Sequence, residues 1–304
     1  MADASPTPEE SAAASELPVA GPITRMLVGW DGTPPSEAAI GWALARAAGG
    51  RSSIEIARTV DETYVSADYV VTESTVEWVR DELTERVLRL NREHPALAIT
   101  ARLFQGDPVE ELRRESDAST LVVVGTHARK GPAMRFAWSL GARLAAMATG
   151  PVAIIPLQDT AQNTGIVVGV DGSPASMLAI DFAAGEALRE GMVLVAVHAW
   201  LSPPMWLDAQ LDEESMAAME RMHDAILTDA LVLVAARYPG LVIERRLQMG
   251  DPHWVLLDAA EKAGMLVVGN HGRRGISRLL LGSVSHSIVL NLKVPTVVVR
   301  EPGR

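Results

Sequence analysis

The chain contains the same pattern twice, and this repetition constrains its fold more than any other feature. The segment "MLVGWDGTPPSEAAIGWALARA" matches "IVVGVDGSPASMLAIDFAAGEA" around the shared core V-G-x-D-G-[TS]-P. Three more pairs follow in the same order: "RLFQGDPVEEL" with "RLQMGDPHWVL", "LVVVGTHARKG" with "LVVGNHGRRG", and "GPVAIIP" with "VPTVVVR". Equivalent residues lie 140 positions apart at Asp31 and Asp171, and 144 apart at Gly125 and Gly269. We therefore expect two tandem domains, residues 24–157 and 164–301, joined by the short polar segment "LQDTAQNTG".

Each copy alternates apolar strands with helical patterns. In the second copy the expected strands are "GIVVGV", "MVLVAVHAW", "LVIERRL", "MLVVG" and "PTVVV", and a long helix is expected over residues 213–238. The long helix of the first copy has apolar residues in steps of three and four, at Val76, Val79, Leu83, Val87 and Leu90. This alternation predicts an α/β fold: two tandem doubly wound parallel five-stranded sheets with helices on both faces, Rossmann-like or flavodoxin-like. Such sheets bind ligands beyond the carboxyl ends of the strands, where the strand order reverses.

Composition excludes several classes of function. The net charge of −11 argues against nucleic acids and anionic membranes as partners. The absence of cysteine excludes disulfides and thiolate chemistry. Residues 1–23, rich in Ala, Ser, Pro and Glu, are expected to form a disordered tail without the features of a signal peptide. No apolar run is long enough for a transmembrane helix, and we expect a cytoplasmic protein.

The segment "VVGNHGRRGISRLLLGSVSHSIV" of the second copy is the strongest candidate for a binding loop. Gly269 ends the fourth strand, Gly272 follows after two residues, and Gly282 follows after nine more, with Ser283 next. Glycine permits positive φ and a close approach of backbone to a ligand. Ser283 and Ser285 open the last helix, whose N-terminus favours an anion such as phosphate. Alternatively, the glycines only shape a strand-to-helix connection and Ser283 caps the helix.

The spacing G-x2-G-x9-G-[ST], together with an Asp at the end of the first strand, resembles the universal stress protein family. The match is to its ATP-binding branch in the tandem form common in actinobacteria, and it covers nearly the whole chain after the tail. The resemblance implies that ATP is bound, with Mg²⁺ held through the phosphates. It implies binding residues Val170, Asp171 and Ala199 for base and ribose, Val268 and Gly269 along the pocket, and Gly272, Gly282, Ser283, Val284 and Ser285 around the phosphates.

The same resemblance bears on assembly. Members of the family pair their terminal strands across a dimer, and the segments "PVAIIP" and "PTVVV" would be apolar sheet edges in the two copies. We therefore expect the two copies to pair within the chain, with a homodimer as a further possibility.

The first copy departs from the binding pattern. At the equivalent positions Gly125, Ser139 and Asp31 are kept, but Gly272 is replaced by Ala128 and Gly282 by Trp138. A side chain as large as indole would occupy the place where backbone should meet phosphate, and it would be strained at positive φ. The first copy is therefore expected to bind ATP weakly or not at all. The alternative is that the loop shifts and Trp138 faces the core.

The weaker candidates for binding are Asp31, Gly125 and Ser139 of the first copy and His271 and Arg273 of the second. His271 and Arg273 could contact phosphate or could be ordinary loop residues. We identify no catalytic base or nucleophile and no histidine spacing typical of a metal site, so no catalytic or metal-ligating residue is predicted. The favoured function is an ATP-binding regulatory protein of the stress response. The alternatives are a nucleotide-free scaffold of the same fold and an ATP-using enzyme with slow hydrolysis. The latter lacks the expected S-G-G-x-D-S after the first strand, where "VGVDGSP" stands.

Overall fold

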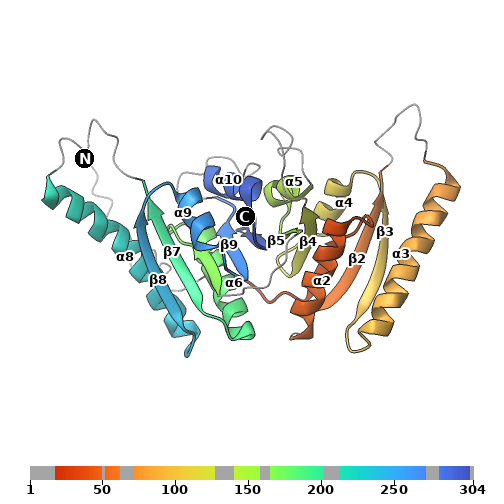
Figure 1. Ribbon diagram of the computed structural model, residues 1–304, viewed down its shortest axis with the longest axis horizontal. Coiled ribbons are helices and arrows are strands. Elements are labelled where there is room, and N and C mark those ends of the chain that lie inside the picture. The colour runs from red at the N-terminus through yellow and green to blue at the C-terminus, as the bar shows by residue number, and fades with distance from the viewer. Residues whose placement is uncertain are drawn as a thin grey trace, which may run out of the picture.

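A single mixed sheet runs through both copies in the computed structural model (Figure 1), which describes residues 18–49, 52–61, 71–126, 140–157, 165–201, 212–271 and 281–301. Within these residues the strand order is β3-β2-β1-β4-β5-β10-β9-β6-β7-β8. The strands are β1 (Arg25–Gly29), β2 (Ser53–Val60), β3 (Ile99–Gln105), β4 (Thr120–Thr126), β5 (Val152–Pro156), β6 (Ile166–Gly169), β7 (Leu194–Trp200), β8 (Ile243–Met249), β9 (Met265–Gly269) and β10 (Thr296–Val299).

Helices cover both faces of the sheet. They are α2 (Pro34–Ala48), α3 (Glu73–Glu93), α4 (Pro108–Arg114), α5 (Leu140–Met147), α6 (Pro174–Glu190), α8 (Glu213–Arg237), α9 (Pro252–Ala259) and α10 (Ser283–Asn291). One core cluster contains buried residues of α2, α3, α6 and α8, and the other contains buried residues of α4, α5, α9 and α10. Each cluster therefore packs against one face of the sheet, as a doubly wound fold requires.

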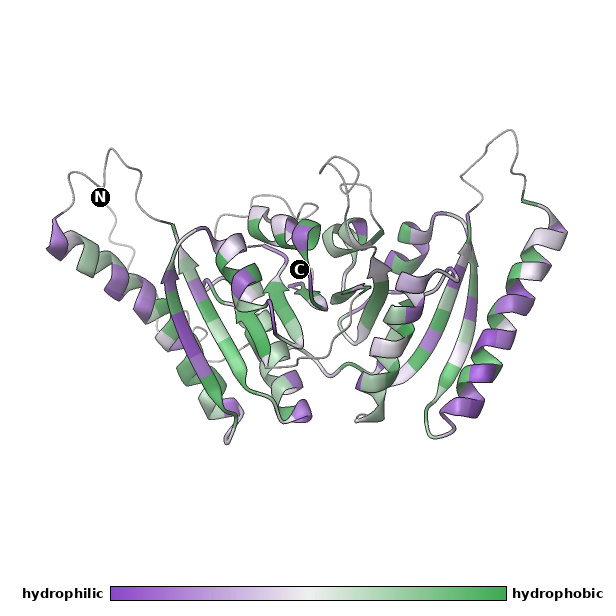
Figure 2. Ribbon diagram, viewed as in Figure 1, coloured by the Kyte–Doolittle hydropathy of each residue, from purple (hydrophilic) through white to green (hydrophobic). Residues whose placement is uncertain are grey.

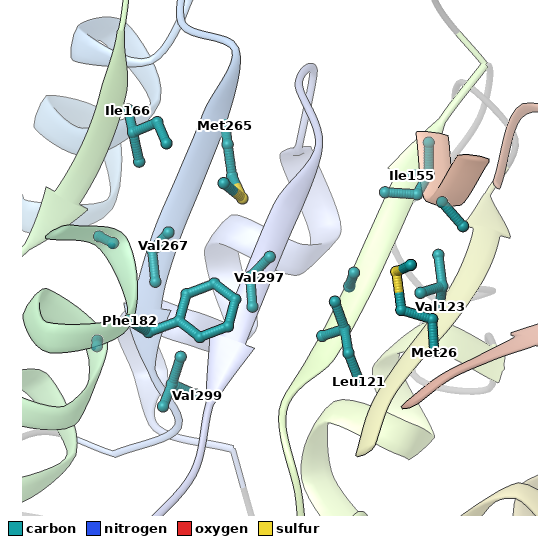
Figure 3. Packing of buried hydrophobic residues seen from close by; sticks show 14 of the residues in the cluster. Met26, Leu121, Val123, Ile155, Ile166, Phe182, Met265, Val267, Val297 and Val299 are labelled. Carbon is teal, nitrogen blue, oxygen red and sulfur yellow. The ribbon is translucent and has the colours of Figure 1, made fainter. Parts of the chain in front are cut away.

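Each copy forms a five-stranded parallel half in which the strand order reverses between its first and fourth strands. The predicted fold class is confirmed. The two halves meet where β5 pairs antiparallel with β10, in the register Ile154–Thr296, Ala153–Val297 and Val152–Val298. The expected edge strands thus cover each other. Figure 3 shows the core continuing across this seam, with Ile155 and Leu121 on one side and Val297 and Phe182 on the other.

Hydrophobic patterning follows this arrangement. Interior strands are apolar along most of their length, whereas α3 and the edge strand β8 carry many polar residues (Figure 2). The predicted stripe on α3 buries Val79, Leu83, Val87 and Leu90, while Val76 is only half-buried. These four buried side chains hold a mostly hydrophilic helix against the sheet.

The last residues of the predicted tail contact the second copy in the structure. The backbone N–H of Ala20 donates to Oδ2 of Asp181 at 2.7 Å, and Arg237 donates to the carbonyl of Pro18 at 3.2 Å. Composition alone predicts disorder here, because it does not show that a buried carboxylate on α6 and a cation on α8 can bind the backbone of this segment. We call residues 18–24 the N-terminal strap.

Two glycines of the repeat are explained by helix packing. A β-carbon at Gly269 would lie 2.8 Å from the carbonyl carbon of Ala175, at the start of α6. A β-carbon at Gly125 would lie closer still to the carbonyl of Pro35, at the start of α2. Neither glycine has positive φ. Glycine is therefore needed at both positions because a helix start approaches the strand, whether or not a ligand binds.

This packing predicts that Gly125→Ala lowers the free energy of unfolding by about 1–3 kcal/mol, the range for an overpacked core. The matched control is Gly41→Ala, since Gly41 is exposed within α2 and nothing lies within 4 Å of its added methyl group. That control should raise stability by about 1 kcal/mol through helix propensity. Urea denaturation measures both, and a neutral Gly125→Ala would contradict the close approach.

Candidate functional site

The repeated D-G-[TS]-P motif forms a tight turn between a strand and a helix. In the second copy Oδ1 of Asp171 accepts from the backbone N–H of Ser173 at 2.9 Å and from its hydroxyl at 2.6 Å. Gly172 has φ of 76°, and Ser173 caps α6, whose first residue is Pro174. Each residue of the motif therefore has a local role. Together they fix a carboxylate at the carboxyl end of β6, beside the point where the strand order reverses.

The first copy builds the same turn. Oδ1 of Asp31 accepts from the backbone N–H of Thr33 at 3.0 Å and from its hydroxyl at 2.6 Å. Partial burial opposes ionisation of Asp31, but hydrogen bonds involving Thr33 and Ser36 outweigh it and hold the pKa of this carboxyl below its ordinary value. A carboxylate thus stands at the same place in both copies, so this feature does not distinguish them.

In the second copy, two hydrogen bonds tie the start of α10 to the end of β9. The hydroxyl of Ser285 donates to the carbonyl of Gly269 at 2.6 Å, and the N–H of Gly282 donates to the carbonyl of Asn270 at 2.8 Å. We call this pair of contacts the α10 clamp. Ser285 is buried, and Gly141 occupies its place in the first copy. Ser285 was predicted to lie around the phosphates. In the structure its hydroxyl donates to a carbonyl of the strand and positions the helix.

Gly282, and not Ser283, is the N-cap of α10. Its φ is −60° and its ψ is 154°, an extended conformation open to most residues. Positive φ therefore does not explain the glycine at this position. No side chain of the described chain caps α10, and Ser283 is exposed at the first helical position. The first N–H groups of α10 thus lack a side-chain acceptor there.

Asn270 and His271 bring unpaired polar atoms to the same edge. The amide nitrogen of Asn270 donates to Nδ1 of His271 at 2.6 Å, which leaves the proton of a neutral His271 ring on Nε2. Nε2 of His271 and Oδ1 of Asn270 are both buried without a hydrogen-bond partner. Buried polar atoms without partners are rare in folded proteins. His271 therefore presents a candidate donor, and its carbonyl also accepts from the hydroxyl of Ser173 at 3.4 Å.

The expected base and ribose positions differ in accessibility. Ala199 is half-buried near the end of β7, whereas Val170 and Val268 are each only 3% exposed. Val268 belongs to the core that packs against α9 and α10, so its side chain is committed to the interior. The carbonyl of Val170 accepts from Nδ1 of His198 at 2.6 Å.

A histidine pair beside this region was missed by the sequence analysis. Nε2 of His198 lies 2.8 Å from Nδ1 of His223, and the His223 ring stacks on Trp200 with centroids 4.8 Å apart. The pair links β7 to α8 next to the carbonyl of Val170. A search for metal-type spacing could not find it, because 25 residues separate the two histidines. The usable signal was strand alternation, which places His198 in the interior.

The first copy fills the equivalent region with larger side chains. Trp30 takes the place of Val170, and Arg58 takes the place of His198. The guanidinium of Arg58 lies 5.0 Å from the Trp30 ring and 5.7 Å from the Trp78 ring, and it pairs with Glu82 at 2.6 Å. This cluster of a cation and two indoles occupies the end of β2. The two copies therefore differ in their described residues as well as in the loop.

The structure thus brings several predicted residues to one edge of the second copy: Asp171, Ala199, Gly269, His271, Gly282, Ser283, Val284 and Ser285. Five of the residues discussed above lie outside the described residues, namely Gly272 and Arg273 of the second copy and Ala128, Trp138 and Ser139 of the first. Among the described residues, no helix combines the length and apolar character needed to cross a membrane.

Comparison with known proteins agrees with the repeat. The family model described as "Universal stress protein family" matches residues 22–156 and again residues 163–300. A universal stress protein of Mycolicibacterium smegmatis is 30% identical over 90% of this chain and 96% of its own length. Universal stress protein Rv2005c of Mycobacterium tuberculosis is 30% identical over 91% of this chain and 97% of its own length.

Among solved structures, a universal stress protein from Archaeoglobus fulgidus matches with a TM-score of 0.65. It covers 92% of this chain and 97% of that one at 18% identity, so it supports the fold over the full tandem arrangement. The family model and the relatives at 30% identity show more, since they match both copies in sequence. The chain therefore belongs to the universal stress protein family and contains two tandem domains of that family.

Proposed function

We propose that the second copy binds ATP and that the chain is a nucleotide-dependent regulatory protein of the stress response. The α10 clamp carries this proposal. It fixes a helix start without a side-chain cap beside the end of β9, on the same edge as the Asp171 carboxylate and the His271 ring. A helix N-terminus favours phosphate, and a fixed carboxylate can accept from a ribose hydroxyl.

The chemistry of a nucleotide fits this edge. Phosphate would meet the N–H groups at the start of α10, with Nε2–H of His271 as a further donor. The ribose would lie near Asp171, and the base would lie near Ala199 and the backbone of Val170. Local donors are required, because the protein as a whole carries a charge of −11 and does not attract anions by its overall field. Mg²⁺ would arrive with the phosphates and be held through them.

The proposal assigns ATP mainly to the second copy. In the first copy Trp30, Arg58 and Trp78 form a stack where the base would lie, and Arg58 is already paired with Glu82. Gly141 replaces the clamp residue Ser285, so the helix α5 lacks that hydroxyl bond to its strand. These differences add to the replacement of two loop glycines in the sequence.

A nucleotide-free scaffold is the second candidate, and one observation favours it. Gly125 and Gly269 are both accounted for by the approach of α2 and α6, so their presence alone does not require a ligand. The scaffold does not account for the buried unpaired atoms of Asn270 and His271.

Binding stoichiometry tests the proposal directly. We expect titration with Mg-ATP in a calorimeter to give one ATP per chain, with little release of ADP over hours. Two tightly bound ATP molecules would contradict the assignment to the second copy. No uptake would favour the scaffold, and fast turnover would favour the enzyme.

Gly282→Glu tests the position of the phosphates. Because φ at Gly282 is −60°, a side chain is tolerated by the backbone, and the variant should fold. A carboxylate against phosphate should raise Kd about 100-fold, about 2.8 kcal/mol. Gly282→Gln has the same size without the charge, and we expect Kd to change less than about tenfold. Equal effects of Glu and Gln would mean that bulk, and not charge, matters there.

Ser285→Gly reproduces the first copy at the clamp. Loss of the hydroxyl bond to Gly269 should cost about 1–1.5 kcal/mol and weaken ATP binding roughly tenfold, because the start of α10 is no longer fixed. Ser287→Gly on the same helix is the control for the effect of glycine on helix stability. If both variants weaken ATP binding equally, the clamp has no special role.

A further inference from the structure

The two copies are related by an approximate two-fold axis at the seam. In the β5–β10 register Ala153 lies opposite Val297, and these residues are equivalent in the repeat because they lie 144 positions apart. Ile154 and Thr296 exchange places with Val152 and Val298 about the same point. If two identical copies paired about such an axis, each residue close to the axis would face the same residue of the other copy.

The charged residues at this axis are opposite in sign. Arg46 at the end of α2 and Glu186 near the end of α6 occupy equivalent positions, 140 residues apart. Nε and Nη2 of Arg46 donate to the two carboxylate oxygens of Glu186, at 3.0 and 2.5 Å. Their side chains are only 9% and 8% exposed. A buried, bidentate ion pair therefore joins two equivalent positions of the repeat. In a pairing of like copies, each of these residues would face the same residue of the other copy.

The surroundings of this pair are also different in the two copies. Arg189 donates to the Glu186 carboxylate at 2.8 Å and to the carbonyl of Arg46 at 3.1 Å. Its equivalent in the first copy is Gly49, and a β-carbon there would lie 3.2 Å from Nη1 of Arg189. The glycine of the first copy thus leaves space for the Arg189 side chain of the second copy.

The N-terminal strap adds a third one-sided contact. Asp181 on α6 is 1% exposed and accepts from Ala20 of the strap, from Arg237 and from the Tyr238 hydroxyl. Gly41 stands at the equivalent place on α2 and is exposed. The segment that precedes the first copy therefore binds the second copy, and α2 has glycine in place of a carboxylate at the equivalent position.

From these three contacts we infer that the seam is a selective surface: a first copy accepts a second copy of this chain and rejects another first copy. Pairing of like copies about the same axis would bury Arg46 against Arg46, or Glu186 against Glu186. Two buried Arg46 guanidinium groups would repel each other with no carboxylate between them, which is strongly unfavourable, whereas each Glu186 would keep its bond to Arg189 of its own copy. The partner that the surface fits is the opposite copy, and in the intact chain that copy is supplied by the chain itself.

A charge exchange tests this inference in the full-length protein. Arg46→Glu and Glu186→Arg each place like charges at the seam, and the double exchange restores opposite charges. We expect hydrogen exchange at the amides of residues 152–154 and 296–298 to become at least about tenfold faster in each single variant. Protection should return to within about twofold of the parent in the double variant. Arg114→Glu and Glu244→Arg, which change exposed side chains by the same charge, should leave these amides unaffected.

The double variant keeps the test valid if a single variant fails to fold. It must fold and protect both strands if opposite sign is what the seam requires. A double variant as deprotected as the worse single variant would overturn the inference, as would single variants with unchanged protection.

Partner choice is tested by mixing the two single variants. In the mixture, position 46 is acidic in the Arg46→Glu variant and basic in the Glu186→Arg variant, so the first copies of the two chains can pair. Light scattering should therefore show a complex of at least two chains that neither variant forms alone. Absence of this complex at about 100 μM of each chain, well above the Kd of a specific micromolar interface, would overturn the selectivity.

Discussion

The antiparallel pairing of β5 with β10 is the contact on which the rest of the structure depends. Every residue of both strands is buried, so either copy alone would end in a bare apolar edge. Pairing covers both edges and makes the two core clusters continuous from one copy to the other. It also brings α5 into contact with α10, the helices that follow β4 and β9, near the centre of the molecule (Figure 1).

Much of this architecture could be predicted from the sequence because the signals were local and repeated. The strands were recognisable as apolar runs, and the matching order of four segments indicated two copies. The repeated G-D-P segments are another local signal, because Asp107 and Asp251 cap the helices α4 and α9, which begin at the following prolines. Patterns of this kind depend on residues within one or two turns of each other, and the sequence displays them directly.

Other features depend on contacts between distant segments, and these were not predictable. Glu82 and Arg86 have the spacing of an ion pair along one helix, but Glu82 binds Arg58 and Arg86 binds Glu37. Gly269 and Gly282, which flank the loop, do not adopt positive φ, whereas Gly172 and Gly32, in the turns after the two aspartates, do. In both cases a residue type permits several conformations or partners, and tertiary packing decides among them.

The two copies share a backbone plan but have separate side-chain chemistry at the edge that carries the candidate site. The Asx-type turn at Asp31 and Asp171 is nearly identical in geometry. The neighbouring strand ends differ, with a histidine pair in one copy and an arginine between two indoles in the other. A duplicated fold can therefore retain the element that shapes a site while the residues that would contact a ligand change.

The N-terminal strap has a consequence for synthesis. Residues 18–24 leave the ribosome before any strand of the sheet, yet their acceptor Asp181 and their donor Arg237 belong to the second copy. Domains generally fold in order as they emerge. Ile23 and Thr24 can bind Ser52, Ser53 and Ser119 of the first copy as it folds. Pro18 and Ala20 have no binding site at that stage, and their contacts are complete only after more than two hundred further residues have been made. Pro18 and Ala20 are therefore synthesised before every strand of the sheet but are among the last residues to complete their contacts.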